Sequence, residues 1–212
     1  MARPVHADAD ATRRRILESA VSLFADRGLD GASVRDVASG ADVSLAMVSH
    51  YFGSKDDLYG ACVAAMYEEL LSMRADLERE LDGRAPLDEL FARAVTTTFR
   101  FARAHRTAVR LLMRAATATG EVAPPGRQLL LGAIDLIAGA VERRTGRPAA
   151  DVRLPVQSLV FLVARYAAQD EGELAAVAGL PPRERRRAVE AVEAHLVGLA
   201  LTLLTPRTRK AR

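Results

Sequence analysis

Residues 42–58, DVSLAMVSHYFGSKDDL, contain a tight turn followed by two helix starts. Ser44 and Ser54 each precede a helical pattern, and a serine hydroxyl at that position caps the free N–H groups of a helix N-terminus. Gly53 separates the two expected helices. Asp42 lies in the turn before the first of them, and aspartate tolerates the left-handed backbone that a tight turn requires. The stretch therefore predicts a short helix held between two capped turns.

Two further helices are expected before this stretch. The first runs from about Thr12 to Arg27 and ends at Gly28, a residue typical of helix C-termini. The second begins at Ser33 and buries apolar residues at helical spacing, with the small residue Ala38 where it crosses the third helix. Two short helices joined by so few residues cross steeply. This spacing predicts a helix-turn-helix.

The third expected helix, residues 44–52, turns Val48 and Phe52 inward, because each residue rotates by about 100° along a helix. Taken alone, His50 is typical of a surface histidine and Lys55 of a solvated charge. Yet an outward face without a long charged side chain fits a helix in the DNA major groove, and Lys55 beside a helix N-terminus can bind phosphate. The expected outward residues, flanks included, are Leu45, Ala46, Met47, Ser49, His50 and Tyr51.

Residues 12–58 resemble the DNA-binding domain of the TetR family of bacterial transcriptional regulators, over about a quarter of the chain. The resemblance implies a homodimer that binds a palindromic double-stranded DNA operator, and we expect it to act as a repressor. It also implies a small-molecule effector in a helical C-terminal domain. Many members have glycine where this chain has Asp42. The candidate DNA-binding residues are Ser33, Ser44, Leu45, Ala46, Met47, Ser49, His50, Tyr51 and Lys55.

The 212 residues are 50% apolar, and apolar residues recur every three or four positions, which predicts an all-α protein of about nine helices. We expect a helix-turn-helix domain at 1–54, a larger helical bundle at 55–205 and a basic tail at 206–212. The chain has no run of about 18 apolar residues and no leader pattern, so a cytoplasmic protein without membrane contact is expected. Its one cysteine excludes an internal disulfide.

The net charge of +3 does not locate a nucleic-acid site. Residues 206–212 hold four basic side chains and no acid, which leaves about −1 for the rest of the chain. Residues 1–55 hold seven basic and seven acidic side chains and are formally neutral. The DNA-binding hypothesis therefore depends on the local arrangement of a few groups rather than on bulk charge.

Two C-terminal helices carry apolar seams with spacings of three and four residues, typical of helices that pack nearly parallel. The seams fit either an internal core contact or an interface between two copies. The resemblance favours the interface, because such helices pair across the two-fold axis in that family. The candidate dimer residues are Val156, Val160, Val163, Val189, Val192, Leu196, Leu199 and Leu203.

The effector site is less defined. Helices expected at Leu87–Ala118 and Pro125–Thr145 supply apolar residues that fit either a pocket or a simple core. The candidate pocket residues are Tyr67, Phe91, Val95, Phe99, Met113, Ile134 and Tyr166. A basic stripe with steps of 3, 4 and 4 fits either an anionic ligand or a solvated face, and consists of Arg103, Arg106, Arg110 and Arg114.

Two other function classes remain open on the sequence. An enzyme is disfavoured because the four histidines lie far apart and neither a glycine-rich phosphate loop nor a nucleophile turn is present. We therefore expect no catalytic residue, no cofactor and no metal. A helical carrier or sensor of apolar small molecules, with a non-functional DNA-binding part, is the second alternative. The neutral charge of residues 1–55 gives it slight support.

Overall fold

The computed structural model describes residues 5–81, 85–119 and 124–205, and every regular element in these ranges is an α-helix. The all-α prediction is confirmed, with ten helices in the described residues instead of about nine. The predicted basic tail lies outside the described residues. The helices are α1 Val5–Gly31, α2 Val34–Gly40, α3 Leu45–Phe52, α4 Lys55–Leu81, α5 Leu87–Ala104, α6 Arg106–Thr119, α7 Pro124–Thr145, α8 Ala150–Ala168, α9 Glu171–Val177 and α10 Arg185–Leu204.

Two helices differ from their expected bounds. Helix α1 begins at Val5, ahead of the expected start, while Gly28 interrupts its helical backbone with a φ of 74°, where the sequence predicts an end. The single helix expected over residues 87–118 is wrong, since His105 leaves the helical conformation and separates α5 from α6. The break could not be predicted from the sequence, because it carries no glycine or proline.

The described chain divides into two units, which do not follow the expected boundary after residue 54. Met1–Glu69 and Thr107–Pro125 form the first unit, and Leu70–Arg106 and Gly126–Arg212 form the second. Helix α4 therefore starts in the first unit and ends in the second. Helix α6 belongs with the helix-turn-helix, although 53 residues of chain separate α3 from α6.

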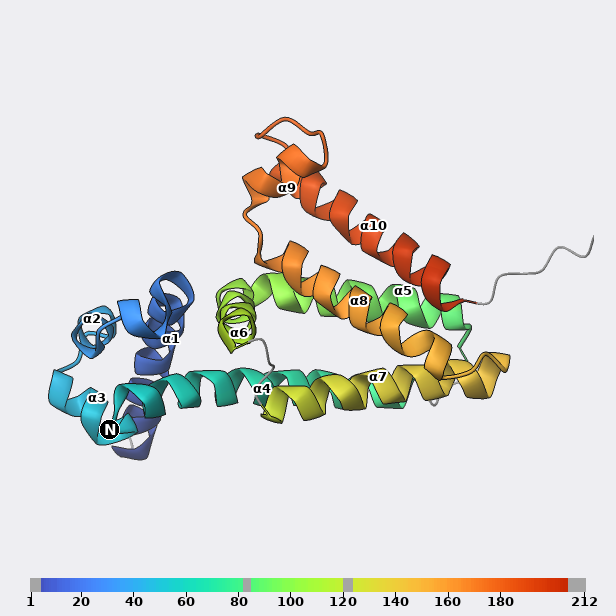
Figure 1. Cartoon of the computed structure of the whole chain (residues 1–212). Coiled ribbons are helices and arrows are strands. Elements are labelled where there is room, and N and C mark those ends of the chain that lie inside the picture. The colour runs from blue at the N-terminus through green and yellow to red at the C-terminus, as the bar shows by residue number, and fades with distance from the viewer. Residues whose placement is uncertain (1–4, 82–84, 120–123, 206–212) are drawn as a thin grey trace, which may run out of the picture. The chain divides into compact units, whose positions relative to one another are not determined.

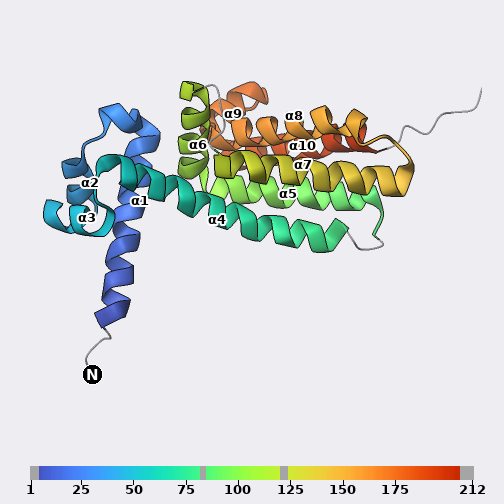
Figure 2. The same cartoon turned by 60° about the horizontal axis from the view of Figure 1, so that its bottom comes forward.

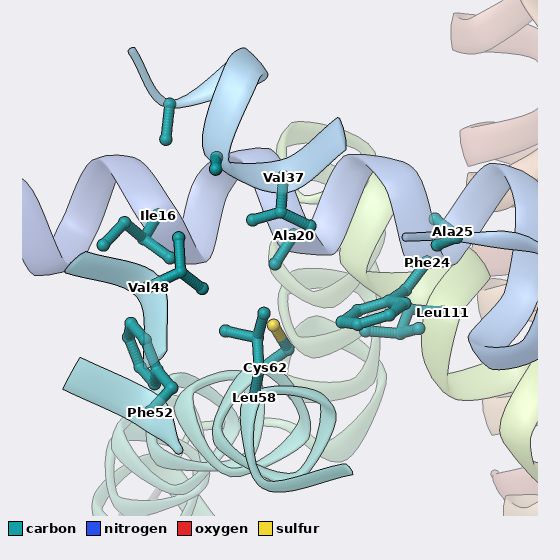
Figure 3. Close-up of a cluster of buried hydrophobic side chains, with 13 residues drawn as sticks. Ile16, Ala20, Phe24, Ala25, Val37, Val48, Phe52, Leu58, Cys62 and Leu111 are labelled. Atoms are coloured by element: carbon teal, nitrogen blue, oxygen red, sulfur yellow. The ribbon is translucent and has the colours of Figure 1, made fainter. Parts of the chain in front are cut away.

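The core of the first unit is built from side chains of α1, α2, α3, α4 and α6 (Figure 3). Helix α1 contributes Ile16, Ala20 and Phe24, and these meet Val37 and Val48 of the two short helices. Helix α4 adds Leu58 and Cys62, and α6 adds Leu111, all at most 1% exposed. Burial raises the pKa of the Cys62 thiol to about 12, so this cysteine stays a neutral core residue.

The second unit is a bundle in which α10 packs on α5, α8 and α9, and α5 packs on α8 (Figures 1 and 2). Arg103 ties α5 to the end of α8 by donating to the carbonyl oxygens of Ala167, at 3.1 Å, and Gln169, at 2.6 Å. Arg100 of α5 makes two 2.8 Å hydrogen bonds to the Glu193 carboxylate of α10. These hydrogen bonds between distant parts of the chain join α5 to α8 and α10, in addition to the apolar packing of the same helices. In the described ranges, no helix has the length and apolar character needed to span a membrane.

Candidate nucleic-acid interface

The turn between α2 and α3 has the geometry that the sequence predicts. Asp42 adopts a left-handed φ of 54°, and the next N–H, of Val43, donates to the Ala38 carbonyl at 3.0 Å. Ala38 is buried where the two helices approach each other, and Val48 is buried on the facing side of α3. The turn therefore sets α3 at a defined angle on α1 and α2.

Serine hydroxyls cap both short helices. Ser33 Oγ accepts a hydrogen bond from the Asp36 N–H at 3.1 Å, and Ser44 Oγ accepts one from the Met47 N–H at 3.2 Å. The Asp36 carboxylate forms an ion pair with Arg27 of α1, with a distance of 3.0 Å between the nitrogen and the oxygen. Both candidate serines are thus exposed residues whose observed contacts position α2 and α3.

The face of α3 opposite the core is exposed along its length. Val48 and Phe52 occupy the buried positions, as predicted, while Leu45 and Met47 are 42% and 37% exposed. Ala46, Ser49 and His50 are exposed as well. Tyr51 is half-buried and packs against the core of the first unit, with its ring centroid 5.5 Å from that of His50. The structure therefore brings the predicted outward residues other than Tyr51 together on one accessible surface.

The start of α4 lies directly after α3 and is closed by a reciprocal cap. Ser54 Oγ accepts from the Asp57 N–H at 3.1 Å, and the Asp57 carboxylate accepts from the Ser54 N–H at 3.0 Å and the Ser54 hydroxyl at 2.6 Å. The hydroxyl and N–H bonds from Ser54 lower the pKa of Asp57. Lys55, at the first position of this helix, is half-exposed. Its ammonium can reach an anion beside the free N–H groups.

An arginine of α1 packs against the end of α3. The Arg13 guanidinium lies 5.3 Å from the centroid of the Phe52 ring, a cation–π distance. Arg14 and Arg15 are exposed on the same helix. Arg13 therefore has a structural contact within the unit.

Each arginine of the predicted stripe contacts another segment of its own unit. Arg103 and Arg106 bind the α8–α9 junction in the second unit, the latter through Asp170 at 3.8 Å. Arg110 and Arg114, which are exposed, bind the end of α1 in the first unit, through the Asp26 carboxylate at 3.1 Å and its carbonyl at 3.2 Å. Two members of the stripe thus belong to each unit.

Four of the eight candidate dimer residues are core residues of a single chain. Val156, Val163, Val192 and Leu196 are at most 5% exposed and lie where α8 and α10 pack within the second unit. The partly buried members are Val189, Leu199 and Leu203, and Val160 is 37% exposed. At those four residues the apolar seam is therefore an internal core contact, which is one of the two alternatives that the sequence allowed.

The exposed apolar residues of α8 lie on its other face. Leu154 is 76% exposed and Phe161 is 53% exposed. Each is two residues from a buried valine, and two residues rotate a helix by about 200°. Helix α10 exposes small residues, Ala191, Ala194 and Gly198. These residues were not predicted from the sequence, although a second, separate apolar row on α8 could have indicated Leu154 and Phe161.

The candidate pocket residues do not gather in one unit. Tyr67 and Met113 belong to the first unit, whereas the other five belong to the second. Phe91, Phe99 and Ile134 are at most 3% exposed. Phe91 and Ile134 pack in the core of the second unit, with Val95 partly buried against it. These residues have the burial of core residues.

Comparison with known proteins supports the helix-turn-helix. Residues 16–62 match the family model described as bacterial regulatory proteins, tetR family. The HTH-type transcriptional regulator YttP of Bacillus subtilis is 45% identical over 58 residues, which are 27% of this chain and 28% of that protein. The HTH-type transcriptional repressor KstR2 of Rhodococcus jostii is 32% identical over 98 residues, 46% of each. The chain thus spans less than half the length of these curated relatives.

Solved structures resemble the chain over nearly its whole length. A TetR-like transcriptional regulator from Rhodococcus sp. RHA1 is 25% identical, with a TM-score of 0.64, over 95% of this chain and 98% of that one. The ketosteroid transcriptional regulator KstR2 of Mycobacterium tuberculosis shares the fold, with a TM-score of 0.67, 20% identity and coverage of 92% and 95%. These similar proteins are transcriptional regulators rather than enzymes, in agreement with the expectation from the sequence.

Proposed function

Because the chain belongs to the TetR family of bacterial transcriptional regulators, we propose that it is a ligand-responsive repressor that binds a palindromic DNA operator as a homodimer. The observation that carries the proposal is the exposed, uncharged face of α3 on an intact helix-turn-helix. A major groove admits one α-helix, and the N-terminal residues of the second helix of such a motif contact base edges.

DNA contact would be divided among three kinds of group. Ser49, His50 and Tyr51 would donate or accept hydrogen bonds at base edges or phosphates, and Lys55 would bind phosphate at the start of α4. Ser33 and Ser44 would contribute mainly by capping, since their hydroxyls already accept backbone hydrogen bonds. The intact caps and turn also argue against the alternative of a carrier with a non-functional DNA-binding part.

The homodimer would use the exposed faces of α8 and α10. Leu154 and Phe161 of α8 present large apolar side chains to solvent, together with the candidate Val160. Gly198 and its small neighbours on α10 would allow a second copy to approach closely. A two-fold interface brings the same surface of both copies together, which a palindromic operator requires.

A small-molecule effector would act through the second unit. Its bundle contains three of the candidate pocket residues as core residues, Phe91, Phe99 and Ile134, together with the half-buried Val95 and Tyr166. Tyr67 lies on α4, the helix that the two units share. A ligand with different affinities for two positions of α4 would change the presentation of Lys55 and α3 to the operator.

The proposal is tested by selecting fragments of the source genome on the purified full-length chain and footprinting the enriched DNA. We expect one palindromic motif, with an affinity that falls by orders of magnitude between low and moderately high salt, because bound phosphates release counterions. The double variant Ser49→Asp with His50→Asp is the matched control, since it changes only exposed α3 residues. Absence of any enriched palindrome with the unmodified chain would overturn the proposal.

A further inference from the structure

The first turn of α3 exposes three consecutive apolar residues, Leu45, Ala46 and Met47. The core does not account for them, because Val48 and Phe52 fill the inward positions of α3. Leu45 and Met47 are also not among the side chains that pack against the core of the first unit. These exposed apolar side chains are therefore free to contact another molecule.

The same turn is held in place by its cap. Ser44 Oγ accepts a hydrogen bond from the Met47 N–H at 3.2 Å, and the Val48 side chain on the opposite face is 1% exposed. Both contacts restrict the backbone that carries Ala46 and Met47. The methionine side chain remains flexible and polarizable, which lets it adapt to an uneven apolar surface.

The chemistry of the remaining α3 side chains limits what the helix can read. Guanine is recognised by two donors of arginine or lysine, adenine by asparagine or glutamine, and cytosine by an acidic side chain. Residues 45–52 contain none of these six residue types. The apolar group that a major groove presents is the C5-methyl of thymine.

We infer that Met47, with the small Ala46 beside it, reads a thymine methyl group in each half-site of the operator. The inference rests on the proposed DNA-binding function and specifies the chemistry of its site. Met47 covers a thymine methyl with its thioether end, and Ala46 leaves room for the base edge to approach the helix. Ser49 and His50, one turn further on, add single hydrogen bonds to the neighbouring bases.

The test replaces single thymines of the selected operator by deoxyuridine, which lacks only the C5-methyl. Binding of the full-length chain is measured by fluorescence anisotropy at one salt concentration. Burial of one methyl group corresponds to about a fourfold change in Kd, and to about fifteenfold when both half-sites are changed. We expect this loss at one or more thymines of each half-site.

Variants assign the methyl contact to α3. With Met47→Ala, the loss caused by deoxyuridine at the contacted thymine should disappear, whereas Met47→Leu should retain most of it. Val177→Ala, which changes an exposed apolar residue of α9, is the matched control and should leave the loss unchanged. A deoxyuridine effect that is the same in Met47→Ala would overturn the assignment.

The inference and the proposed function fail in different ways. Equal affinity for every deoxyuridine operator and the thymine operator would overturn methyl readout while leaving DNA binding intact. Half-sites without thymine in the selected motif would do the same. Absence of any enriched motif would instead overturn the proposed function itself.

Discussion

The two units of the chain build their helices by different means. In the first unit, serine side chains accept backbone hydrogen bonds at the starts of α2, α3 and α4. In the second unit, α5, α8 and α10 begin without a side-chain cap, whereas the short α9 has one, from Asp170. Local hydrogen bonds thus define the DNA-binding helices, whereas packing between distant segments defines the bundle.

This difference has a functional reason. A short helix such as α3 cannot gain enough burial to hold its own position, because the face that would meet DNA stays exposed. Caps and a tight turn supply the rigidity instead. The long helices of the bundle each bury one face along several turns and need no such local device.

The largest predicted effect is a loss of stability, and it distinguishes the core residues of α8 and α10 from the exposed ones. Leu196→Asp places a carboxylate at a fully buried position, and we expect it to cost about 4 kcal/mol or more and to abolish the cooperative thermal transition. Phe161→Asp changes an exposed residue and should leave that transition nearly unchanged, while light scattering shows monomers. Circular dichroism and light scattering check the two effects.

Val177→Asp is the control for both variants, since it changes an exposed residue of α9 and should alter neither stability nor mass. A Phe161→Asp protein that stays dimeric would place the interface elsewhere. A folded, monomeric Leu196→Asp protein would show instead that the buried apolar seam of α8 and α10 belongs to the dimer interface.

The next effect separates base contacts from phosphate contacts within the first unit. We expect His50→Ala to relax the preference at one operator position by about 1–3 kcal/mol. Lys55→Ala should weaken binding to all sequences alike and reduce the salt slope by about 1. Titrations at several salt concentrations, with operator and scrambled DNA, distinguish the two. Identical behaviour of both variants would contradict the division of roles.

A smaller effect tests the contrast in capping directly. Ser44→Ala removes the acceptor of the Met47 N–H and should lower the free energy of unfolding by about 1 kcal/mol. Glu184→Ala, at the start of α10, removes no cap hydrogen bond but only a surface ion pair with Arg187, and should change it by no more than about 0.5 kcal/mol. Urea unfolding measures both. Equal losses would mean that the two units depend on their helix starts to the same degree.

The smallest effect is a pH dependence at the start of α4. Hydrogen bonds from Ser54 lower the pKa of Asp57 in the folded chain. Their contribution is therefore complete above the ordinary pKa of aspartate, about 4, and is lost as the pH falls through the lower folded value. Thermal unfolding of the unmodified chain and Asp57→Asn should differ at neutral pH and converge in acid. A difference that is constant with pH would contradict the cap.

The helix-turn-helix and the start of α4 were predicted in detail from the sequence because their signals are local. Ser44, Gly53 and Ser54 stand within a few residues of the groups they act on, so the bounds of α3 and α4 followed from spacing. The left-handed turn at Asp42 could be predicted for the same reason. Exposure of the α3 face then followed from helical rotation alone.

The second unit was predicted less well because periodicity identifies a buried face but not the partner that buries it. Val156 and Leu196 have the spacing of an interface, yet helices of the same chain cover them. The break at His105 also escaped prediction. Its neighbours are typical helix formers, and the contacts of the arginines on either side of it are with residues more than 60 positions away.

The place of Leu111 in the core of the first unit bears on how the protein is made. A ribosome releases the helix-turn-helix first, at roughly 5–20 residues per second. The apolar surface that Leu111 covers stays exposed until α6 has also emerged, and until then the Asp26 carboxylate and carbonyl lack their contacts with Arg110 and Arg114. The first unit therefore completes its folding only after more than half of the chain has been synthesised.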